Sequence, residues 1–141
     1  MEARIIKLNK WANSHTNIIT DILRIAFGAF ILYKGIFFLN ETEYFSEALG
    51  HSNTEGIYFI LVHYVALVHL CGGFFICIGL ITRLCSLLQL PILIGAVLVN
   101  FTSKMDVSNL VQASVACALC CFFMVYGSGK HSADYSLKLN V

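Results

Sequence analysis

Four long runs of hydrophobic residues, separated by shorter polar segments, dominate the chain. They cover about residues 18–39, 57–81, 84–101 and 110–126. Each run has close to the ~20 residues that a helix needs to cross the hydrocarbon of a bilayer. Backbone groups in lipid must be satisfied within the structure, and the runs are too long and too uniformly apolar for barrel strands. The pattern therefore predicts four membrane-spanning helices.

The connections between the runs predict how these helices are arranged. Thr82 and Arg83 form a tight turn between the second and third runs, and residues 102–109 form another short link. Short links favour antiparallel neighbours. We therefore expect an all-α, integral membrane, up-down four-helix bundle in which residues 1–141 form a single transmembrane domain. The composition agrees, since 58% of the residues are hydrophobic and 12% are charged, against about a quarter charged in soluble domains.

Basic residues predict the orientation of the bundle. They lie in the two tails and in the second connection, at Arg4, Lys7, Lys10, Arg83, Lys130 and Lys138. The connections on the opposite side carry Lys104. Because cytoplasmic segments are enriched in Lys and Arg, we expect both termini in the cytoplasm. The sequence has no basic cluster typical of nucleic-acid binding, so the expected partners are the bilayer and other membrane subunits or further copies of this chain.

The first connection, residues 40–56, would then lie on the outer side. Its Tyr44, Phe45, Ala48 and Leu49 recur at helical spacing. This spacing is typical of a short helix on the membrane surface. An ordinary loop with a few buried side chains fits it as well.

Three ionisable residues interrupt the first hydrophobic run. At 1.5 Å per residue, Asp21 and Arg24 fall in the cytoplasmic third, whereas Lys34 falls in the outer third near the level of His63. Such residues usually face the bundle interior, pair with each other or line a cavity. Asp21 and Arg24 are three residues apart, which favours an ion pair. For Lys34 two interpretations remain: its stem reaches to the outer headgroups, or it forms a pocket with His63 for the polar head of a quinone or lipid.

Glycines predict which helix faces meet. They are Gly28 and Gly35 on the Arg24 face of the first run, and Gly72, Gly73 and Gly79 on the His69 side of the second. Small residues let membrane helices approach closely, so we expect these faces to pack together and Arg24 and His69 to point inward. His63 and His69 are about 120° apart around the helix, which argues against a haem held by both. A hydrogen-bonded structural role for His69 is the simpler interpretation.

No self-contained catalytic motif is present. Cys117 and Cys120 have the CxxC spacing of dithiol oxidoreductases, whose reactive cysteine gains from a helix amino terminus. They lie in the middle of the fourth run, where a cysteine behaves as a small apolar residue. The sequence has no Ser/His/Asp grouping, phosphate loop or metal-ligand spacing. We therefore expect no metal site and, at most, an accessory subunit of an oxidoreductase.

Several motifs resemble those of the DoxX-like membrane proteins. The matching stretches are Leu23-Arg24-Ile25-Ala26-Phe27-Gly28 with Tyr33-Lys34-Gly35, Cys71-Gly72-Gly73 through Gly79-Leu80-Ile81-Thr82-Arg83, and Gly127-Ser128-Gly129-Lys130 with Ser132 and Asp134. The resemblance implies a four-helix protein of the bacterial inner membrane. Some members are associated with thiosulfate:quinone oxidoreduction and others with membrane-bound oxidoreductase assemblies. It also implies that Arg24 and Asp134 could pair, with the glycines folding the tail beneath the bundle. The tyrosine after Asp134 and the extra cysteines depart from the family pattern.

Two functions follow as expectations. The first is a small membrane subunit of a redox or respiratory-type complex, contacting a quinone or lipid headgroups near Lys34 and His63. The second is a non-enzymatic assembly or scaffold protein whose glycine faces bind partner helices. The quinone function requires a cavity that reaches the outer polar layer. The scaffold function requires a lipid-facing groove filled by another protein.

Overall fold

A computed structural model describes residues 17–40, 55–102 and 107–137, with the side chains of 55–59 and 102 left out of the description. Its helices are α2 (Ile18–Asn40), α4 (Glu55–Ile78), α5 (Thr82–Thr102), α6 (Val107–Tyr126) and the short α7 (Ala133–Ser136). The first four are long and apolar enough to cross a membrane. The described residues contain no strand, so the predicted all-α membrane bundle is confirmed. The surface helix considered for the first connection lies outside the described residues.

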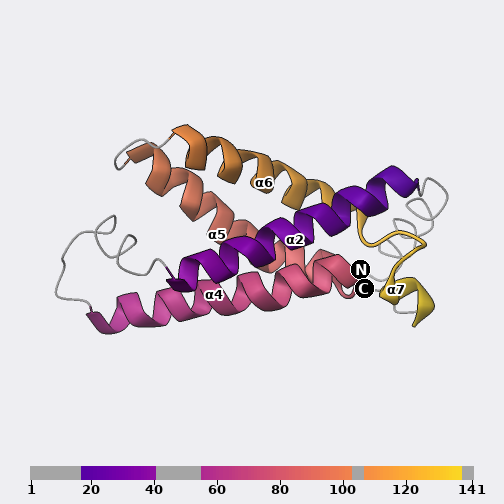
Figure 1. Cartoon of the computed structure of the whole chain (residues 1–141), viewed down its shortest axis with the longest axis horizontal. Helices are drawn as coiled ribbons and strands as arrows, with labels where there is room; N and C mark the ends of the chain where they lie inside the picture. Colours follow the sequence, from indigo (N-terminus) through magenta and orange to yellow (C-terminus); the bar gives the residue numbers. More distant parts are fainter. Residues whose placement is uncertain (1–16, 41–54, 103–106, 138–141) are drawn as a thin grey trace.

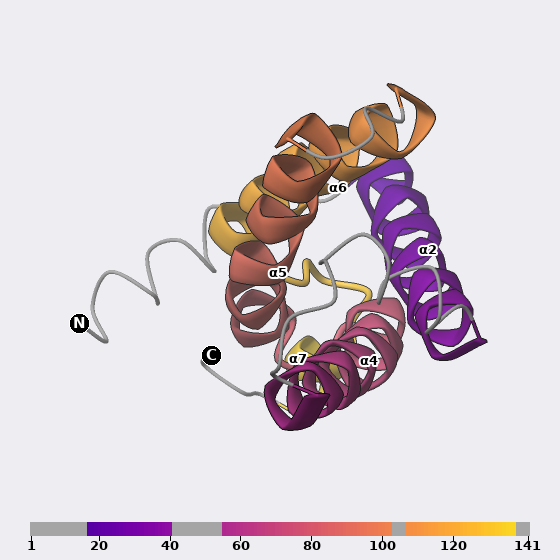
Figure 2. The same cartoon turned by 90° about the vertical axis from the view of Figure 1, so that its left-hand side faces the viewer.

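The four long helices form two antiparallel pairs (Figure 1). α2 packs along α4, α5 packs along α6, and α4 joins the two pairs through α5. The pairs diverge toward the end of the bundle opposite α7, and Figure 2 looks onto that end. α2 and α6 touch at few positions. Their contacts include the stacking of Phe27 on Phe123, whose ring centroids are 5.8 Å apart, and the hydroxyls of Thr20 and Tyr126, which lie 3.3 Å apart.

Glycines allow α2 and α4 to pack backbone against backbone. A Cβ atom built on Gly28 would lie 2.7 Å from the backbone nitrogen of Cys77 and 2.8 Å from the carbonyl oxygen of Gly73. A Cβ atom on Gly73 would lie 2.7 Å from the backbone nitrogen of Leu32, and one on Gly35 would lie 2.9 Å from the Cβ atom of His69. Any larger residue would push the helices apart, because these neighbours are mostly backbone atoms.

The corner between α4 and α5 is set by two residues with positive φ. Gly79 has φ 71° and ends α4 three residues before the hydrophobic run ends. Its amide donates to the carbonyl oxygen of Ile76 at 3.2 Å, and the amide of Leu80 donates to that of Phe75 at 2.8 Å, which together form a Schellman motif. Ile81 has φ 49°, a conformation that a β-branched residue rarely adopts. This corner therefore needs support from elsewhere in the chain.

Candidate functional site

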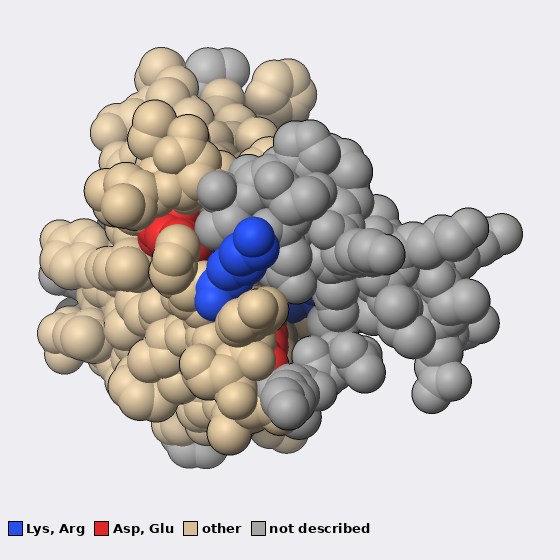
Figure 3. All heavy atoms as spheres, turned by 90° about the vertical axis from the view of Figure 1, so that its right-hand side faces the viewer, with Lys and Arg blue, Asp and Glu red and all other residues tan. Residues whose placement is uncertain are grey.

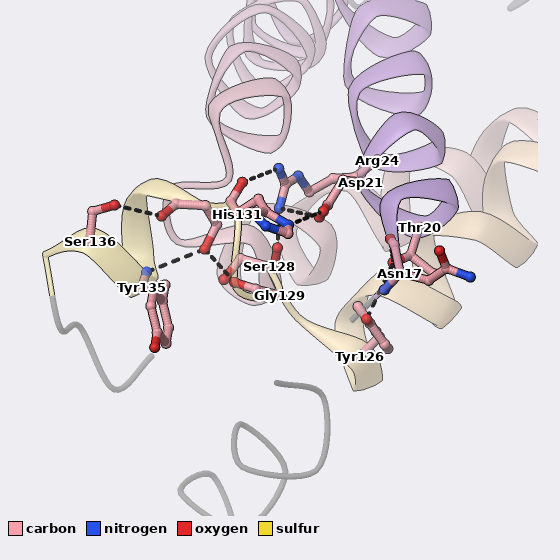
Figure 4. A network of polar contacts seen from close by, with 11 residues as sticks. Asn17, Thr20, Asp21, Arg24, Tyr126, Ser128, Gly129, His131, Tyr135 and Ser136 are labelled. Carbon is pink, nitrogen blue, oxygen red and sulfur yellow. Dashed lines mark hydrogen bonds and ion pairs between the residues drawn. The ribbon is translucent and has the colours of Figure 1, made fainter. Parts of the chain in front are cut away.

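The α7 end of the bundle carries a polar network centred on Arg24 (Figure 4). Arg24 is 3% exposed and forms an ion pair with Asp21 at 3.7 Å. Its guanidinium also donates to the carbonyl oxygen of Ser128, through Nη1, and to that of His131, through Nη2 at 3.1 Å. Arg24 thus binds the segment after α6 back onto α2. A buried guanidinium requires such partners, because an unpaired buried charge is strongly destabilising.

His131 extends this network to the exposed surface. Its Nδ1 atom lies 2.8 Å from the Asp21 carboxylate, which therefore contacts both an arginine and a histidine. Sequence reasoning did not find His131. The signal that could have found it is its position, because it directly follows the Gly127–Lys130 segment that returns to the bundle.

Asp134 supports the α4–α5 corner rather than Arg24. Its carboxylate accepts a hydrogen bond of 2.8 Å from the backbone amide of Ile81, and its own amide donates to the carbonyl oxygen of Gly79 at 3.1 Å. The hydroxyl of Ser132 accepts from the amide of Tyr135 and caps α7, which places Asp134 in the first turn of that helix. The ion pair of Arg24 is with Asp21, and Asp134 contributes to Arg24 only long-range attraction.

Arg83 is the second basic side chain at this end. Its Nη2 atom lies 3.4 Å from the carbonyl oxygens of both Val125 and Tyr126, at the C-terminus of α6. A cation there complements the helix dipole and the carbonyl groups that lack helical partners. Figure 3 looks onto this end, where basic and acidic side chains lie among uncharged residues. Several motif residues named above meet here, namely Arg24, Arg83, Gly127 and Asp134, and Thr82 directly precedes Arg83 in the chain.

The opposite half of the bundle contains a partly open pocket of about 370 Å³, which we call the chamber. All four long helices line it: Phe30, Ile31, Lys34, Phe37 and Phe38 from α2, Val65 and His69 from α4, Ile92, Leu93, Ala96 and Asn100 from α5, and Asn109, Gln112, Ala113 and Ala116 from α6. Its walls are mainly aromatic and aliphatic, with five polar side chains. Such a combination is typical of a small-molecule site.

Lys34 and His69 are the ionisable side chains of the chamber. Lys34 is half-buried, and its Nζ atom lies 5.7 Å from the ring centroids of both Phe30 and Phe37. These aromatic faces attract the cation within the membrane. His69 is 7% exposed, and its Nδ1 atom has no hydrogen-bond partner of normal geometry among the described residues. The backbone of Val65, one turn earlier in α4, interacts with this ring.

His63 lies elsewhere. It is exposed on α4 and is absent from the residues that line the chamber. The histidine that shares a cavity with Lys34 is instead His69, which lies six residues after His63 on α4. The sequence placed His69 inside the bundle but left its surroundings open. Gln112 and Asn100 also line the chamber.

Between the chamber and the α7 end of the bundle, buried polar groups join α5 to α4 and to α6. Gln89 is fully buried and donates through Nε2 to the carbonyl oxygen of Val68 at 2.9 Å. It fits because position 72 is glycine: a Cβ atom there would lie 2.6 Å from Nε2 of Gln89. The Cys120 thiol donates to the carbonyl oxygen of Ser86 at 2.9 Å.

All six cysteines are free, and no three potential metal ligands come together in the described part of the chain.

Four apolar spans with a chamber between them define a multi-pass membrane protein. The family model for DoxX matches residues 19–102, which is more than half of the chain. The chain therefore belongs to the DoxX family, as its motifs predicted. No curated protein and no solved structure matches it.

Proposed function

We propose that this protein is a small membrane subunit of a redox-linked complex and that its chamber binds the head of a quinone. The observation that supports this most directly is that Lys34, His69 and Gln112, from three different helices, line one aromatic-walled cavity within the membrane-spanning part of the bundle. A scaffold protein has no need of such a cavity.

The residues of the chamber suit a quinone head. The head is a flat, largely apolar ring with oxygen atoms that accept hydrogen bonds. The Lys34 ammonium is a donor, and the imidazole of His69 donates or accepts at Nδ1 according to its tautomer. Phe30 and Phe37 provide apolar walls. A bound quinone supplies two-electron chemistry coupled to proton transfer. The chain itself would hold and orient the head and keep its oxygen atoms out of contact with lipid.

The proposed setting is the bacterial inner membrane, with both termini in the cytoplasm. The positive-inside pattern of the tails and of Arg83 supports this orientation. The network of Arg24, Arg83 and Asp134 would then lie at the cytoplasmic side, and the chamber in the outer half of the membrane. This orientation is tested by labelling cysteines introduced at either end of the chain in intact cells.

The decisive test is the quinone content of the protein purified from its native membrane in a mild detergent. We expect close to one quinone per chain, with a loss of about tenfold in Lys34→Met and in His69→Leu. His63→Ala is the matched comparison on the same helix as His69. It retains the quinone if the head lies in the chamber and loses it if the head lies nearer to His63. A quinone-free protein with unrelated partners would contradict the proposal.

The alternative scaffold function would have to use a surface other than the glycine faces. Gly28, Gly35 and Gly73 are covered by the contact between α2 and α4 within the chain. A partner helix therefore cannot reach them without opening the bundle. Mass spectrometry of the same preparation identifies the partner subunits, and oxidoreductase subunits are the expected ones.

A further inference from the structure

A second hollow of about 320 Å³ lies along the outside of the bundle, between α2 and α6. Leu23 and Ala26 of α2 form one wall, and Val111, Val115 and Leu119 of α6 form the other. We call this hollow the lateral groove. It exists because α2 and α6 touch at few positions beyond the stacked rings of Phe27 and Phe123.

The lateral groove adjoins the chamber. Phe30, Gln112 and Ala116 line both hollows, so one layer of side chains separates them. Ala116 is small, and Phe30 is only partly buried. The chamber contains five polar side chains, whereas the lateral groove is apolar apart from Gln112. A pocket that contains polar side chains beside an apolar groove fits one molecule with a polar head and an apolar chain.

Depth decides which kind of amphiphile fits. Phe30, where the chamber meets the lateral groove, lies ten residues from the end of α2 at Asn40, which is about 15 Å at 1.5 Å per residue. A charged phosphodiester headgroup is costly at this depth in a bilayer. A quinone head is uncharged and carries a single isoprenoid chain. From Leu23 to Phe30 the lateral groove extends about 10 Å along α2, which is too short for a partner helix to bury a whole span.

We propose that the lateral groove binds the isoprenoid chain of the quinone whose head lies in the chamber, and that the ligand enters from the lipid between α2 and α6. This inference rests on the proposed function. It adds the route by which the quinone enters and the binding site of its isoprenoid chain. The isoprenoid chain of the bound quinone leaves the bundle sideways, past Phe30 and Ala116. A residue that fills the lateral groove therefore blocks quinones with a long chain but spares a quinone without one.

The test uses Ala26→Phe, which fills the lateral groove from an exposed position outside the core. Ala29→Phe is the matched control, because Ala29 is exposed on the same helix and is not part of the lateral groove. The full-length protein is placed in lipid nanodiscs. Photolabelling is measured with two azidoquinones that share one head, one with an isoprenoid chain and one without.

We expect Ala26→Phe to lower labelling by the long-chain quinone about tenfold or more, to leave the short one unchanged, and Ala29→Phe to change neither. Equal labelling by the long-chain quinone in Ala26→Phe and wild type would overturn the lateral site while leaving the chamber intact. Failure of both quinones to label the wild-type protein would overturn the proposed function itself.

A second measurement identifies the occupant of the lateral groove directly. A photoreactive p-benzoylphenylalanine is placed at Ile22, an exposed residue one turn before Ala26 that does not itself line the lateral groove. In native membranes it forms an adduct with whatever lies at that end of the lateral groove. Mass spectrometry that finds a quinone adduct supports the proposal. A phospholipid adduct alone, or a cross-link to another protein, overturns it.

Discussion

The carboxylate of Asp134 accepts a hydrogen bond from the backbone amide of Ile81, a residue 53 positions earlier in the chain. Ile81 has a positive φ that is costly for a β-branched side chain, and it forms the corner between α4 and α5. The amide of Asp134 binds the carbonyl oxygen of Gly79 in the same corner. The C-terminal segment thus stabilises the centre of the chain.

Removing this carboxylate should destabilise the protein. Asp134→Ala leaves the partly buried amide of Ile81 without its acceptor, and we expect a loss of about 1–3 kcal/mol in the free energy of unfolding. Asp134→Asn keeps an oxygen acceptor and should lose less. Thermal unfolding in detergent, followed by the reaction of the buried Cys85 and Cys120 with a maleimide dye, measures both variants. Equal stability of Asp134→Ala and the wild type would contradict this role.

Arg24 should be more sensitive still. Arg24→Met removes the partner of the Asp21 carboxylate and of the carbonyl oxygens of Ser128 and His131. Because the buried Asp21 then keeps His131 as its remaining side-chain partner among the described residues, we expect a loss of about 3–5 kcal/mol. His131→Ala, at an exposed position, should have a smaller effect. An Arg24→Met variant with unchanged expression and thermal stability would exclude this structural role.

The glycine contact between α2 and α4 predicts a position-dependent effect of one methyl group. Gly28→Ala places a Cβ atom 2.7 Å from a backbone nitrogen of α4, so the helices must separate. We expect a destabilisation of about 1–3 kcal/mol. Gly95→Ala is the matched control, because a Cβ atom there meets nothing within 4 Å. It should be neutral or slightly stabilising, because alanine favours a helix more than glycine does.

Arg83 should stabilise the end of α6 through its charge. Arg83→Met removes the cation beside the carbonyl groups of Val125 and Tyr126. We expect a loss of about 1 kcal/mol, with part of it recovered in Arg83→Lys. Amide hydrogen exchange of the last turn of α6 measures the effect locally. Unchanged exchange in this turn would show that Arg83 acts elsewhere.

Much of the fold could be predicted from the sequence because it depends on local composition. The length of each hydrophobic run and the cost of unpaired backbone groups in lipid require four helices, and the bundle has them. The presence of Asp21, Arg24 and Lys34 in the first run likewise marked positions that need polar surroundings. The family motif identified Asp134 as important and suggested Arg24 as its partner, whereas its carboxylate accepts from the backbone amide of Ile81.

The partners of these residues were decided only by the tertiary structure. Arg24 and Asp134 bind backbone groups of Ser128, His131 and Ile81, and any residue type presents such groups, so the sequence carries no signal for them. Similarly, His63 and His69 lie on one helix, and the rotation of that helix against its neighbours determines which one lines the chamber.

By itself, therefore, the sequence determined the four spans, the family and the list of polar residues that must avoid lipid, because helix length and hydropathy are properties of each segment alone. The tertiary structure decided that Lys34 and His69 share a chamber and that a lateral groove adjoins it. These features depend on how closely glycines let α2 approach α4, and on how far α6 then lies from α2. Contacts between distant segments set both distances.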